Sequence, residues 1–572
     1  MSAGTIIRVN GPVVEVEGID ASMLELVEVG EAKLPGEVIT LDGPVATVQV
    51  YEHTGGLRPG EPARSTGSPL VATLGPGLIG GVFDGMLRRL SGGPDTIAAG
   101  MGSDTLLPGS RWPFSPAVEA GTEATPGMLI GRFPETEAVE FRVLVPVGVE
   151  GTIDWTAEAG EIGTGDPVLR VGDAELTLVQ TWPVRRPRPI AERRRGGRPL
   201  TTGQRAIDLF YPVAEGSSAA VPGGFGTGKT VLLQQIAKWC DADVIVYVGC
   251  GERGNEMADV LDELSSLRDP RTGGALLDRT VLIANTSNMP VLAREASIYT
   301  GATVAEFYRD MGYRSVVIAD STSRWAEALR EVASRTGELP AEEGYPAGLA
   351  SALAAFYERA ARVRTLGGAD ASVTILGAIS PPGGDMSEPV SAHTRRFVRC
   401  TWALDADLAY ARHYPAVSWT DSSSRDAEPV GEWQARHGDP DWAVRRERAL
   451  RLLADADRLE SIAELVGAGS LPEPERLVLR TAKLLREGVL QQSSLSANDA
   501  RCDPAKQVAL LDLVLGIHDR CARLLDRGVA LATIEQIDLS PVTRARDETP
   551  PDGAAQVRSL LSELLVRLGG LE

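Results

Sequence analysis

A glycine-rich stretch near the middle of the chain has the spacing of a phosphate-binding loop. The segment GGFGTGKT, residues 223–230, matches GxxxxGK[ST] between the apolar run SSAAVP and the helical pattern TVLLQQIAKW. Its glycines let backbone N–H groups turn inward around phosphate oxygens, and the following helix adds the positive end of its dipole. The Lys229 ammonium can neutralise the outer phosphates, and the Thr230 hydroxyl can bind Mg²⁺. Nucleotide binding is therefore favoured over a glycine-rich turn that fits the pattern by chance.

A second candidate lies at the end of an apolar run. The segment SVVIAD ends in Asp320, which the pattern places at the C-terminal edge of a central strand, where parallel α/β sheets bind ligands. An acidic residue at that edge can hold Mg²⁺, usually through water, so Asp320 is the candidate Walker B residue. Strands that end in Asp are common, and the phosphate loop upstream is what favours the metal-binding role.

A third candidate is a carboxylate beside a guanidinium in GCGERGNE, residues 249–256. Glu252 follows the apolar run VIVYV, residues 244–248, and should face the same crevice as Lys229. A carboxylate there could polarise a water for attack on a γ-phosphate, while Arg253 stabilises charge on the transferred group. Alternatively, Glu252 lies at the N-cap or in the first turn of the helix NEMADVLDEL, with Arg253 in solvent. The local sequence does not decide between these two interpretations.

The elements that position these residues fall into four predicted regions. Short strand-like runs separated by Gly, Pro and Asp predict a β-barrel over residues 1–70. A β-rich module over 111–184 is inserted into a P-loop α/β domain formed by 71–110 and 185–435, with a glycine-rich connector at 74–87. Apolar residues at three- and four-residue spacing predict a helical bundle over 436–572. The fold class is therefore multidomain α/β, in keeping with a length of 572 residues.

The α/β domain is predicted to contain buried parallel strands. Its strand-like runs are apolar nearly throughout rather than at every second position, and they alternate with amphipathic helices such as TVLLQQIAKW and SRWAEALREVASR. The predicted strands are DVIVYVG, TVLIANTS, SVVIAD, SVTILGAIS and TWALDADL. Such alternation is typical of an α/β parallel sheet.

The composition disfavours several classes of protein. Lys and Arg number 57 against 78 Asp and Glu, and the net charge of −21 disfavours bulk binding to nucleic acid or anionic lipid. The cysteines show neither CxxC nor Cys/His spacing, which predicts no disulfide framework or zinc site and fits a reducing cytoplasm. They are Cys240, Cys250, Cys400, Cys502 and Cys521. The sequence shows no signal peptide pattern and no apolar run near about 18 residues, so membrane contact is expected only through partners.

Several motifs together resemble the catalytic A subunit of V-type and archaeal-type rotary ATPases over nearly the whole chain. They are GPVVEVEG, QVYEHTGGLRPGEP, GGVFDGMLRRL, QTWPVRRPRP, GGFGTGKT, GERGNE, ADSTSRWAEALRE, PAEEGYPAGLAS, GAISPPGGDMSEPV, RHYPAVSW and CDPAKQVALL. The inserted module at about 111–184 and Phe225 in the phosphate loop distinguish this subunit from its F-type counterpart and from protein-export ATPases. The resemblance implies a RecA-like P-loop domain and ATP synthesis or hydrolysis coupled to H⁺ or Na⁺ translocation.

The resemblance also implies a role for each candidate residue. Glu252 would activate the hydrolytic water, and Arg253 and Arg324 would contact the phosphates. Lys229 and Thr230 would serve the phosphates and Mg²⁺, with Asp320 completing the metal's shell. Tyr414 in RHYPAVSW would pack on the adenine ring, although an ordinary core aromatic is an alternative. The implied nucleotide-binding residues are Gly223, Gly224, Phe225, Gly226, Thr227, Gly228, Lys229, Thr230 and Tyr414.

Three positions depart from the family pattern. Ser418 stands where the family usually has Asp or Asn, which is a plausible exchange of short polar side chains. Leu495 in QQSSL replaces an aromatic, which puts one wall of the adenine site in question. Thr227 replaces the vertebrate-type cysteine of the phosphate loop, so no redox switch is expected there.

The partners implied by the resemblance are the other components of a rotary complex. Three copies would alternate in a hexameric ring with three related non-catalytic B subunits, which would supply an arginine to the site in trans. Central-stalk and peripheral-stalk subunits would connect the ring to an ion-translocating membrane sector, so the chain would lie on the cytoplasmic face of the membrane. The alternatives are a non-catalytic nucleotide-binding ring subunit, or a related export or helicase ring ATPase.

Overall fold

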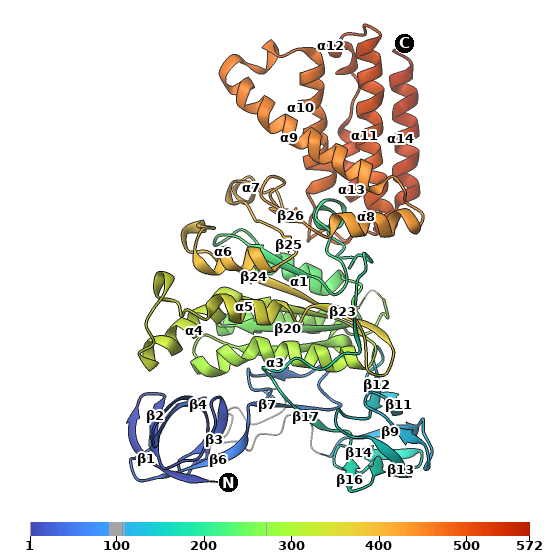
Figure 1. The fold of residues 1–572 in the computed structure, drawn as a ribbon. Helices are drawn as coiled ribbons and strands as arrows, with labels where there is room; N and C mark the ends of the chain where they lie inside the picture. Colours follow the sequence, from blue (N-terminus) through green and yellow to red (C-terminus); the bar gives the residue numbers. More distant parts are fainter. Residues whose placement is uncertain (1, 91–105, 107–108, 270, 572) are drawn as a thin grey trace.

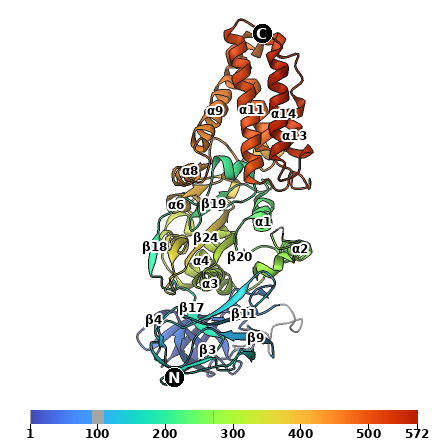
Figure 2. The same cartoon turned by 90° about the vertical axis from the view of Figure 1, so that its right-hand side faces the viewer.

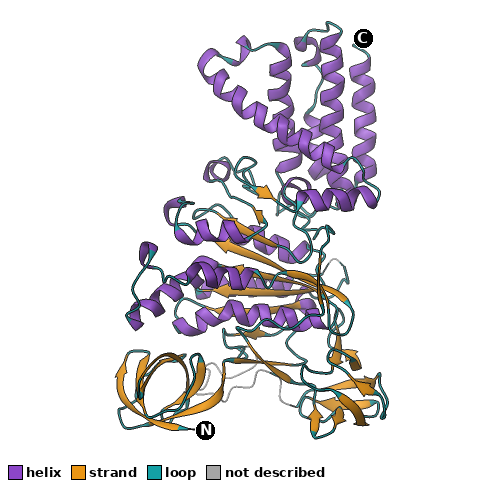
Figure 3. Ribbon diagram, in the orientation of Figure 1, coloured by secondary structure: helices purple, strands orange, loops and turns teal. Residues whose placement is uncertain are grey.

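The computed structural model describes residues 2–90, 106, 109–269 and 271–571. Figure 1 shows an elongated molecule with a β-barrel and a second β module side by side at one end, the α/β domain in the middle and helices at the other end. Figure 3 shows the same gradient from strands to helices. Within the described residues, no helix is long and apolar enough to cross a membrane. The predicted connector 74–87 is described throughout, whereas residues 91–105 and 107–108 of the segment 71–110, predicted as part of the P-loop domain, lie outside the described part.

The N-terminal region is a closed barrel whose strands alternate buried and exposed side chains. The strand order is β1-β2-β5-β4-β3-β6, with antiparallel pairs throughout. Val14, Val16, Val48 and other small apolar residues fill the interior, as the period-two pattern requires. The strands are β1 (Ala3–Asn10), β2 (Val13–Glu17), β3 (Glu25–Val29), β4 (Leu34–Asp42), β5 (Val45–Val50) and β6 (Pro62–Pro69).

The inserted module consists of two four-stranded antiparallel sheets over the described residues 111–176. A short pair, β7 (Val71–Leu74) with β17 (Gln180–Pro183), joins the chain entering the module to the chain leaving it. The module strands are β9 (Arg111–Pro116), β10 (Glu123–Ala124), β11 (Leu129–Pro134), β12 (Glu140–Leu144), β13 (Gly151–Thr156), β14 (Gly160–Gly163), β15 (Leu169–Val171) and β16 (Ala174–Leu176).

A mostly parallel sheet forms the centre of the α/β domain, with the strand order β26-β25-β19-β24-β22-β20-β21-β8. The predicted strands DVIVYVG, TVLIANTS, SVVIAD and SVTILGAIS are confirmed as buried parallel strands. The sheet strands are β8 (Val82–Phe83), β18 (Glu192–Arg194), β19 (Ser218–Pro222), β20 (Val244–Cys250), β21 (Thr280–Asn285), β22 (Arg314–Asp320), β23 (Ala361–Arg364), β24 (Asp370–Ile379), β25 (Cys400–Thr401) and β26 (Ser423–Ser424).

The predicted strand TWALDADL, residues 401–408, is wrong for most of its length. Only Cys400–Thr401 forms a strand, and the chain then turns into the short helix α7 (Ala406–Tyr410). The reason is local, because the Asp405 carboxylate accepts a hydrogen bond from the backbone N–H of Leu408 and caps that helix. The apolar composition of the segment does not reveal this competing helix start.

Helices cover both faces of the central sheet, and Figure 2 shows α1 and α2 to the right of β20 and α4 to its left. The helix patterns TVLLQQIAKW, NEMADVLDEL and SRWAEALREVASR are confirmed as parts of α1, α2 and α4. The bounds are α1 (Lys229–Trp239), α2 (Gly254–Ser266), α3 (Val291–Asp310), α4 (Thr322–Thr336), α5 (Leu349–Tyr357), α6 (Pro389–Phe397), with short turns at Ala206–Phe210, Leu276–Arg279, Glu342–Gly344 and Pro382–Gly384.

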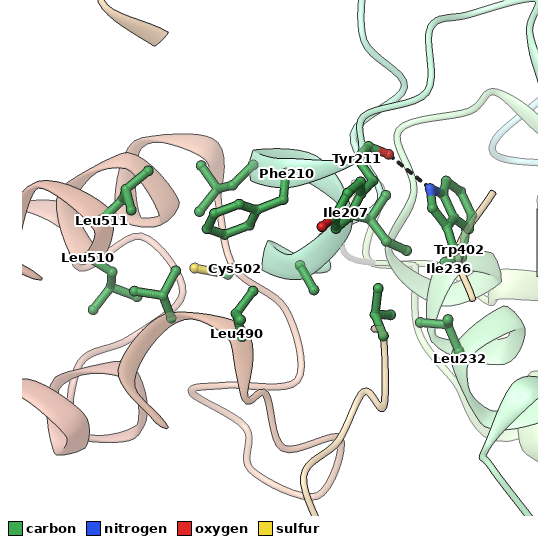
Figure 4. Packing of buried hydrophobic residues seen from close by; sticks show 14 of the residues in the cluster. Ile207, Phe210, Tyr211, Leu232, Ile236, Trp402, Leu490, Cys502, Leu510 and Leu511 are labelled. Atoms are coloured by element: carbon green, nitrogen blue, oxygen red, sulfur yellow. Dashed lines mark hydrogen bonds between the residues drawn. The ribbon is translucent and has the colours of Figure 1, made fainter. Parts of the chain in front are cut away.

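The C-terminal helices pack on the α/β domain through one continuous apolar core. Figure 4 shows Phe210 and Ile207 of the turn Ala206–Phe210 against Leu490, Leu510 and Leu511 of the bundle. The indole N–H of Trp402 donates to the Tyr211 carbonyl at 2.9 Å and ties this core to the sheet. The helices are α8 (Ala427–Arg436), α9 (Trp442–Val466), α10 (Glu473–Leu485), α11 (Pro504–Asp526), α12 (Leu531–Ile534), α13 (Ser540–Glu548) and α14 (Ala554–Gly569), with turns at Ala468–Ser470 and Arg486–Leu490.

Candidate active site

The phosphate loop connects β19 to α1 and has a backbone that only glycine supplies easily. Gly226 and Gly228 have φ of 78° and 87°, in the left-handed region where a Cβ is strained. A Cβ on Gly223 would lie 2.7 Å from the Thr227 hydroxyl oxygen, so the loop is also too tight there for a side chain. The Lys229 ammonium donates to the carbonyls of Gly223 and Gly224 at 2.7 and 2.9 Å, which places the positive charge inside the loop.

A large open cavity of about 1310 Å³ lies at the carboxyl edge of the sheet and gathers most of the predicted residues. Phosphate-loop residues Gly224, Phe225, Gly226, Gly228, Lys229 and Thr230 line it, together with Glu252, Arg253, Asp320 and Arg324. Gly223 and Thr227 are buried behind the loop and support it from inside the fold. Residues from three separate segments of the chain therefore meet in one space.

Glu252 lies in the loop between β20 and α2, outside the helix. Arg253 is the N-cap of α2 and makes no side-chain cap hydrogen bond, so the alternative that Glu252 lies at the N-cap or in the first turn is wrong. Gly251 precedes Glu252 with φ of 75°, and a Cβ there would lie 2.7 Å from the Cβ of Arg324. Backbone hydrogen bonds from Gly251 to the Asn285 carbonyl and from Ser287 to the Glu252 carbonyl, at 2.7 and 2.9 Å, fix the loop. The Glu252 carboxylate is thereby held at the cavity wall.

The charge environment makes Glu252 a stronger base than an exposed glutamate. Burial raises the pKa of its carboxyl to about 8, Asp320 and Glu256 add to that rise, and the Arg324 guanidinium opposes it. Burial also lowers the pKa of Lys229, which the nearby carboxylates Asp320 and Glu252 partly restore. A general base with a pKa near neutrality is suited to removing a proton from water.

Asp320 is almost fully buried at the end of β22. The Tyr247 hydroxyl donates to its carboxylate at 3.2 Å, and the Thr230 hydroxyl is a second donor. Burial raises the pKa of Asp320, whereas these donors and the Lys229 ammonium act to lower it. The Thr230 hydroxyl and the Asp320 carboxylate thus place two oxygens side by side. Among the described residues, no three His, Cys, Asp or Glu gather as a metal cluster, so a cation here would need further oxygens from phosphate or water.

The two predicted arginines border the cavity, and their salt bridges are with Glu256 and Glu327 rather than with Glu252. The Arg253 guanidinium lies 3.9 Å from the Glu256 carboxylate and is 72% exposed. Arg324, in the first turn of α4, donates to both carboxylate oxygens of Glu327 at 2.9 and 3.0 Å. Both guanidiniums sit on exposed sides of the cavity, where they are accessible to a phosphate group.

Tyr414 lies at the far end of the phosphate loop rather than in the cavity lining. A Cβ on Gly228 would be 3.7 Å from its ring, and the side chain is 43% exposed. Ser418 lines the cavity and donates to the Asp421 carboxylate at 2.9 Å, so a short polar contact is retained at this departure from the family pattern. Leu495 is 96% exposed and does not line the cavity.

Sequence reasoning missed several residues that line the cavity, among them Glu256, Ser287 and Arg294. Glu256 lies four residues after Glu252, and its carboxyl makes a side-chain hydrogen bond with the Glu252 carboxyl. Ser287 and Arg294 come from the loop and helix that follow β21, and Arg294 donates to the Ser287 carbonyl at 3.0 Å. The signal that could have found the latter pair is the carboxyl-edge rule, because β21 pairs in parallel with β20.

Four family models match consecutive parts of the chain. They describe the ATP synthase alpha/beta family β-barrel domain (residues 6–67), the barrel-sandwich domain of its subunits (104–185), its nucleotide-binding domain (203–424) and the C-terminal domain of V and A type ATP synthase (431–534). The V-type ATP synthase alpha chain of Nitrosococcus oceani is 50% identical over 95% of this chain and 93% of its own. The chain belongs to the V-type and A-type ATP synthase family. Within that family it is an alpha chain, the component that A-type complexes name the A subunit.

Further relatives of this ATP synthase subunit include both V-type alpha chains and A-type A subunits. The V-type ATP synthase alpha chain of Anaeromyxobacter dehalogenans is 50% identical over 99% of both chains. The A subunit of the A-type ATP synthase of a Desulfurococcus species is 48% identical over 98% of this chain and 97% of its own. The solved structure of EscN from the type III secretion system of enteropathogenic E. coli matches with a TM-score of 0.64, covers 89% of this chain and 99% of its own, and shares 22% identity. That last likeness shows the fold alone.

Proposed function

We propose that this chain is the subunit in which a V/A-type rotary ATPase makes or hydrolyses ATP, coupled through partner subunits to H⁺ or Na⁺ movement. The observation that carries the proposal is the meeting of Glu252, Lys229, Asp320 and Arg324 around one cavity. A subunit that only holds nucleotide would need the phosphate loop but not a carboxylate with a raised pKa beside it. The export ATPase alternative shares the fold, but the close full-length relatives are ATP synthase subunits.

The chain's own residues have distinct parts in the proposed reaction. The phosphate-loop N–H groups and the Lys229 ammonium bind the outer phosphates, and the glycines allow close approach. Glu252 orients a water and accepts its proton as the water attacks the γ-phosphate. Arg253 and Arg324 approach from the exposed side and stabilise the spreading negative charge. Tyr414 packs against the adenine ring.

Thr230 and Asp320 fit a Mg²⁺ ion bound together with the nucleotide. They provide an uncharged hydroxyl and a buried carboxylate, which is the small set of protein oxygens that Mg²⁺ takes when phosphates and waters complete its shell. When bound, the cation would neutralise charge on the phosphates. We also propose that the chain works in a hexameric ring with B subunits, attached through stalk subunits to a membrane sector on the cytoplasmic side.

The decisive experiment replaces the proposed base. We expect Glu252→Gln in a reconstituted complex to lose at least about a hundredfold of its ATP hydrolysis rate, because an amide cannot accept the water's proton. The same variant should still bind ADP, since the phosphate loop is unchanged. Steady-state hydrolysis and ADP titration measure the two effects, with Glu563→Gln on the exposed face of α14 as the matched control. Hydrolysis at the wild-type rate by the Glu252→Gln complex would favour a non-catalytic role.

A further inference from the structure

We propose that a buried cluster of Arg205, Gln492 and Asp499 positions Tyr414 against the nucleotide base and so connects the helical bundle to base binding. The inference rests on the nucleotide site proposed above. Arg205 belongs to the α/β domain, whereas Gln492 and Asp499 belong to the chain that leaves the turn Arg486–Leu490 of the bundle. All three are positioning residues, since they do not line the cavity.

Gln492 is the direct contact with Tyr414. Its backbone N–H donates to the Tyr414 carbonyl at 2.7 Å. Its buried side chain fixes that backbone in place, because the amide nitrogen donates to the Gly203 carbonyl at 2.8 Å and the amide oxygen accepts from the backbone N–H of Arg205 at 2.9 Å. The side chain of Gln492 therefore ties the loop that holds Tyr414 to the segment 203–205 of the α/β domain.

Arg205 fastens the rest of the same loop. Its fully buried guanidinium donates to the carbonyls of Val489 and Gln491 at 2.7 and 2.6 Å. It lies 2.7 Å from the Asp499 carboxylate, which is equally buried. Asp499 in turn accepts from the guanidinium of Arg546 and from the backbone N–H of Ser493. The planar fork of an arginine suits this set of simultaneous contacts, which a lysine could not reproduce.

Tyr414 therefore has two structural neighbours, one beside its ring and one at its backbone carbonyl. On one side is the end of the phosphate loop, where Gly228 leaves room for the ring. The backbone carbonyl of Tyr414 is bound by the bundle loop that ends at Asp499 and is held by Arg205. The backbone N–H of Gln492 is hydrogen-bonded to the Tyr414 carbonyl. If the bundle loop moves relative to the phosphate loop, this bond moves Tyr414 with it. The cluster thus sets the distance between the base-binding and phosphate-binding parts of the site.

The test separates base binding from phosphate binding. We expect Gln492→Met, which keeps the side-chain volume but not its hydrogen bonds, to weaken ADP binding by about tenfold. Binding of inorganic tripolyphosphate, which has no base, should change by less than about twofold. Titrations of the full-length chain with both ligands, followed by calorimetry, give the two affinities.

Two further variants keep the test decisive. Gln491→Met changes the neighbouring glutamine, whose side chain makes only long contacts of 3.3 and 3.4 Å, and should leave both affinities unchanged. Gln492→Glu keeps the oxygen that accepts from the Arg205 backbone N–H and loses the amide that donates to the Gly203 carbonyl. It should therefore also weaken ADP binding without weakening tripolyphosphate binding. This variant serves as the test if the Gln492→Met protein does not fold. Equal weakening of both ligands, or of neither, in a folded variant would overturn the inference. Failure of the wild-type chain to bind ADP would instead contradict the proposed function.

Discussion

At the residue scale, the site is a small set of charges whose burial decides their chemistry. Asp320 and Lys229 are opposite charges in the same partly enclosed space, and the Thr230 hydroxyl bridges toward Asp320. Burial raises the pKa of Glu252 to about 8, and the salt bridges of Arg253 and Arg324 are with other carboxylates. In the proposed reaction, this arrangement separates the carboxylate that would hold the cation from the one that would accept the proton.

The role of Asp320 predicts a change in metal dependence. Asp320→Asn removes the buried charge that would hold the cation. We therefore expect the ratio of ADP affinities with and without Mg²⁺ to be at least about tenfold smaller in this variant than in the wild type. ADP titrations with and without Mg²⁺ measure this difference. Asp526→Asn at the exposed end of α11 is the control, and an unchanged Mg²⁺ effect in Asp320→Asn would show that the cation is held elsewhere.

At the element scale, the inserted module is fastened to the α/β domain through the turn between β11 and β12. Thr136 donates to the Asp278 carbonyl at 2.5 Å, and Arg142 donates to the Met311 carbonyl at 2.6 Å. The carboxylate of Glu135 accepts from the backbone N–H of Gly77 at 2.7 Å and from the Tyr308 hydroxyl at 3.2 Å. The module is therefore bound to both the connector and α3, and its position depends on an ionisable group.

Glu135 predicts a pH dependence of stability. Burial raises its pKa from 4.5 to about 7, so the folded state binds this proton more tightly than the unfolded state. The stability that the protonated Glu135 carboxyl contributes is fully present below pH 4.5 and is lost as the pH rises through about 7. We expect Glu135→Gln to gain stability over the wild type between those values, by roughly 3 kcal/mol at most. Thermal unfolding across this pH range measures the gain, with exposed Glu123→Gln as the control, and a constant difference between variant and wild type would contradict it.

At the scale of the whole molecule, Arg185 joins the barrel to the α/β domain. This arginine follows β17 and binds two buried carboxylates, Glu37 on β4 and Glu295 on α3, while the Tyr51 hydroxyl donates to Glu37. Burial raises the pKa of Glu37 to about 7 although Arg185 opposes this. Because Glu295 is adjacent to the cavity residue Arg294, the barrel is attached to the helix that borders the site.

Loss of this arginine should loosen the barrel. Arg185→Met leaves two buried carboxylates without their cation, and we expect a loss of about 3 kcal/mol in the free energy of unfolding. Thermal unfolding of the full-length chain measures the effect, with the exposed Arg132→Met as the control. Adding Glu37→Gln to Arg185→Met should restore part of the loss, and no restoration would argue against a charge effect.

Local patterns predicted much of this molecule, but contacts between distant segments were outside their reach. The phosphate loop, the strand ending in Asp320 and the bundle helices follow from spacing and periodicity, which short segments carry by themselves. The segment after Thr401 was misread because a single capping residue, Asp405, outweighed its apolar composition. The cluster of Arg205 with Asp499 could not be predicted, because nothing in either segment indicates its partner.

The edge strand β8 has a consequence for how this chain is synthesised. Val82–Phe83 pair in parallel with Leu282 and Ile283 of β21. Strand β8 is therefore the first strand of the central sheet to be synthesised, but it cannot pair until β21 has been made, after the whole inserted module. In the meantime the module, whose two sheets pair only strands of the module with one another, can fold by itself. A fragment that begins after Phe83 would leave the edge of β21 open to pairing with other chains, which is a known route to aggregation.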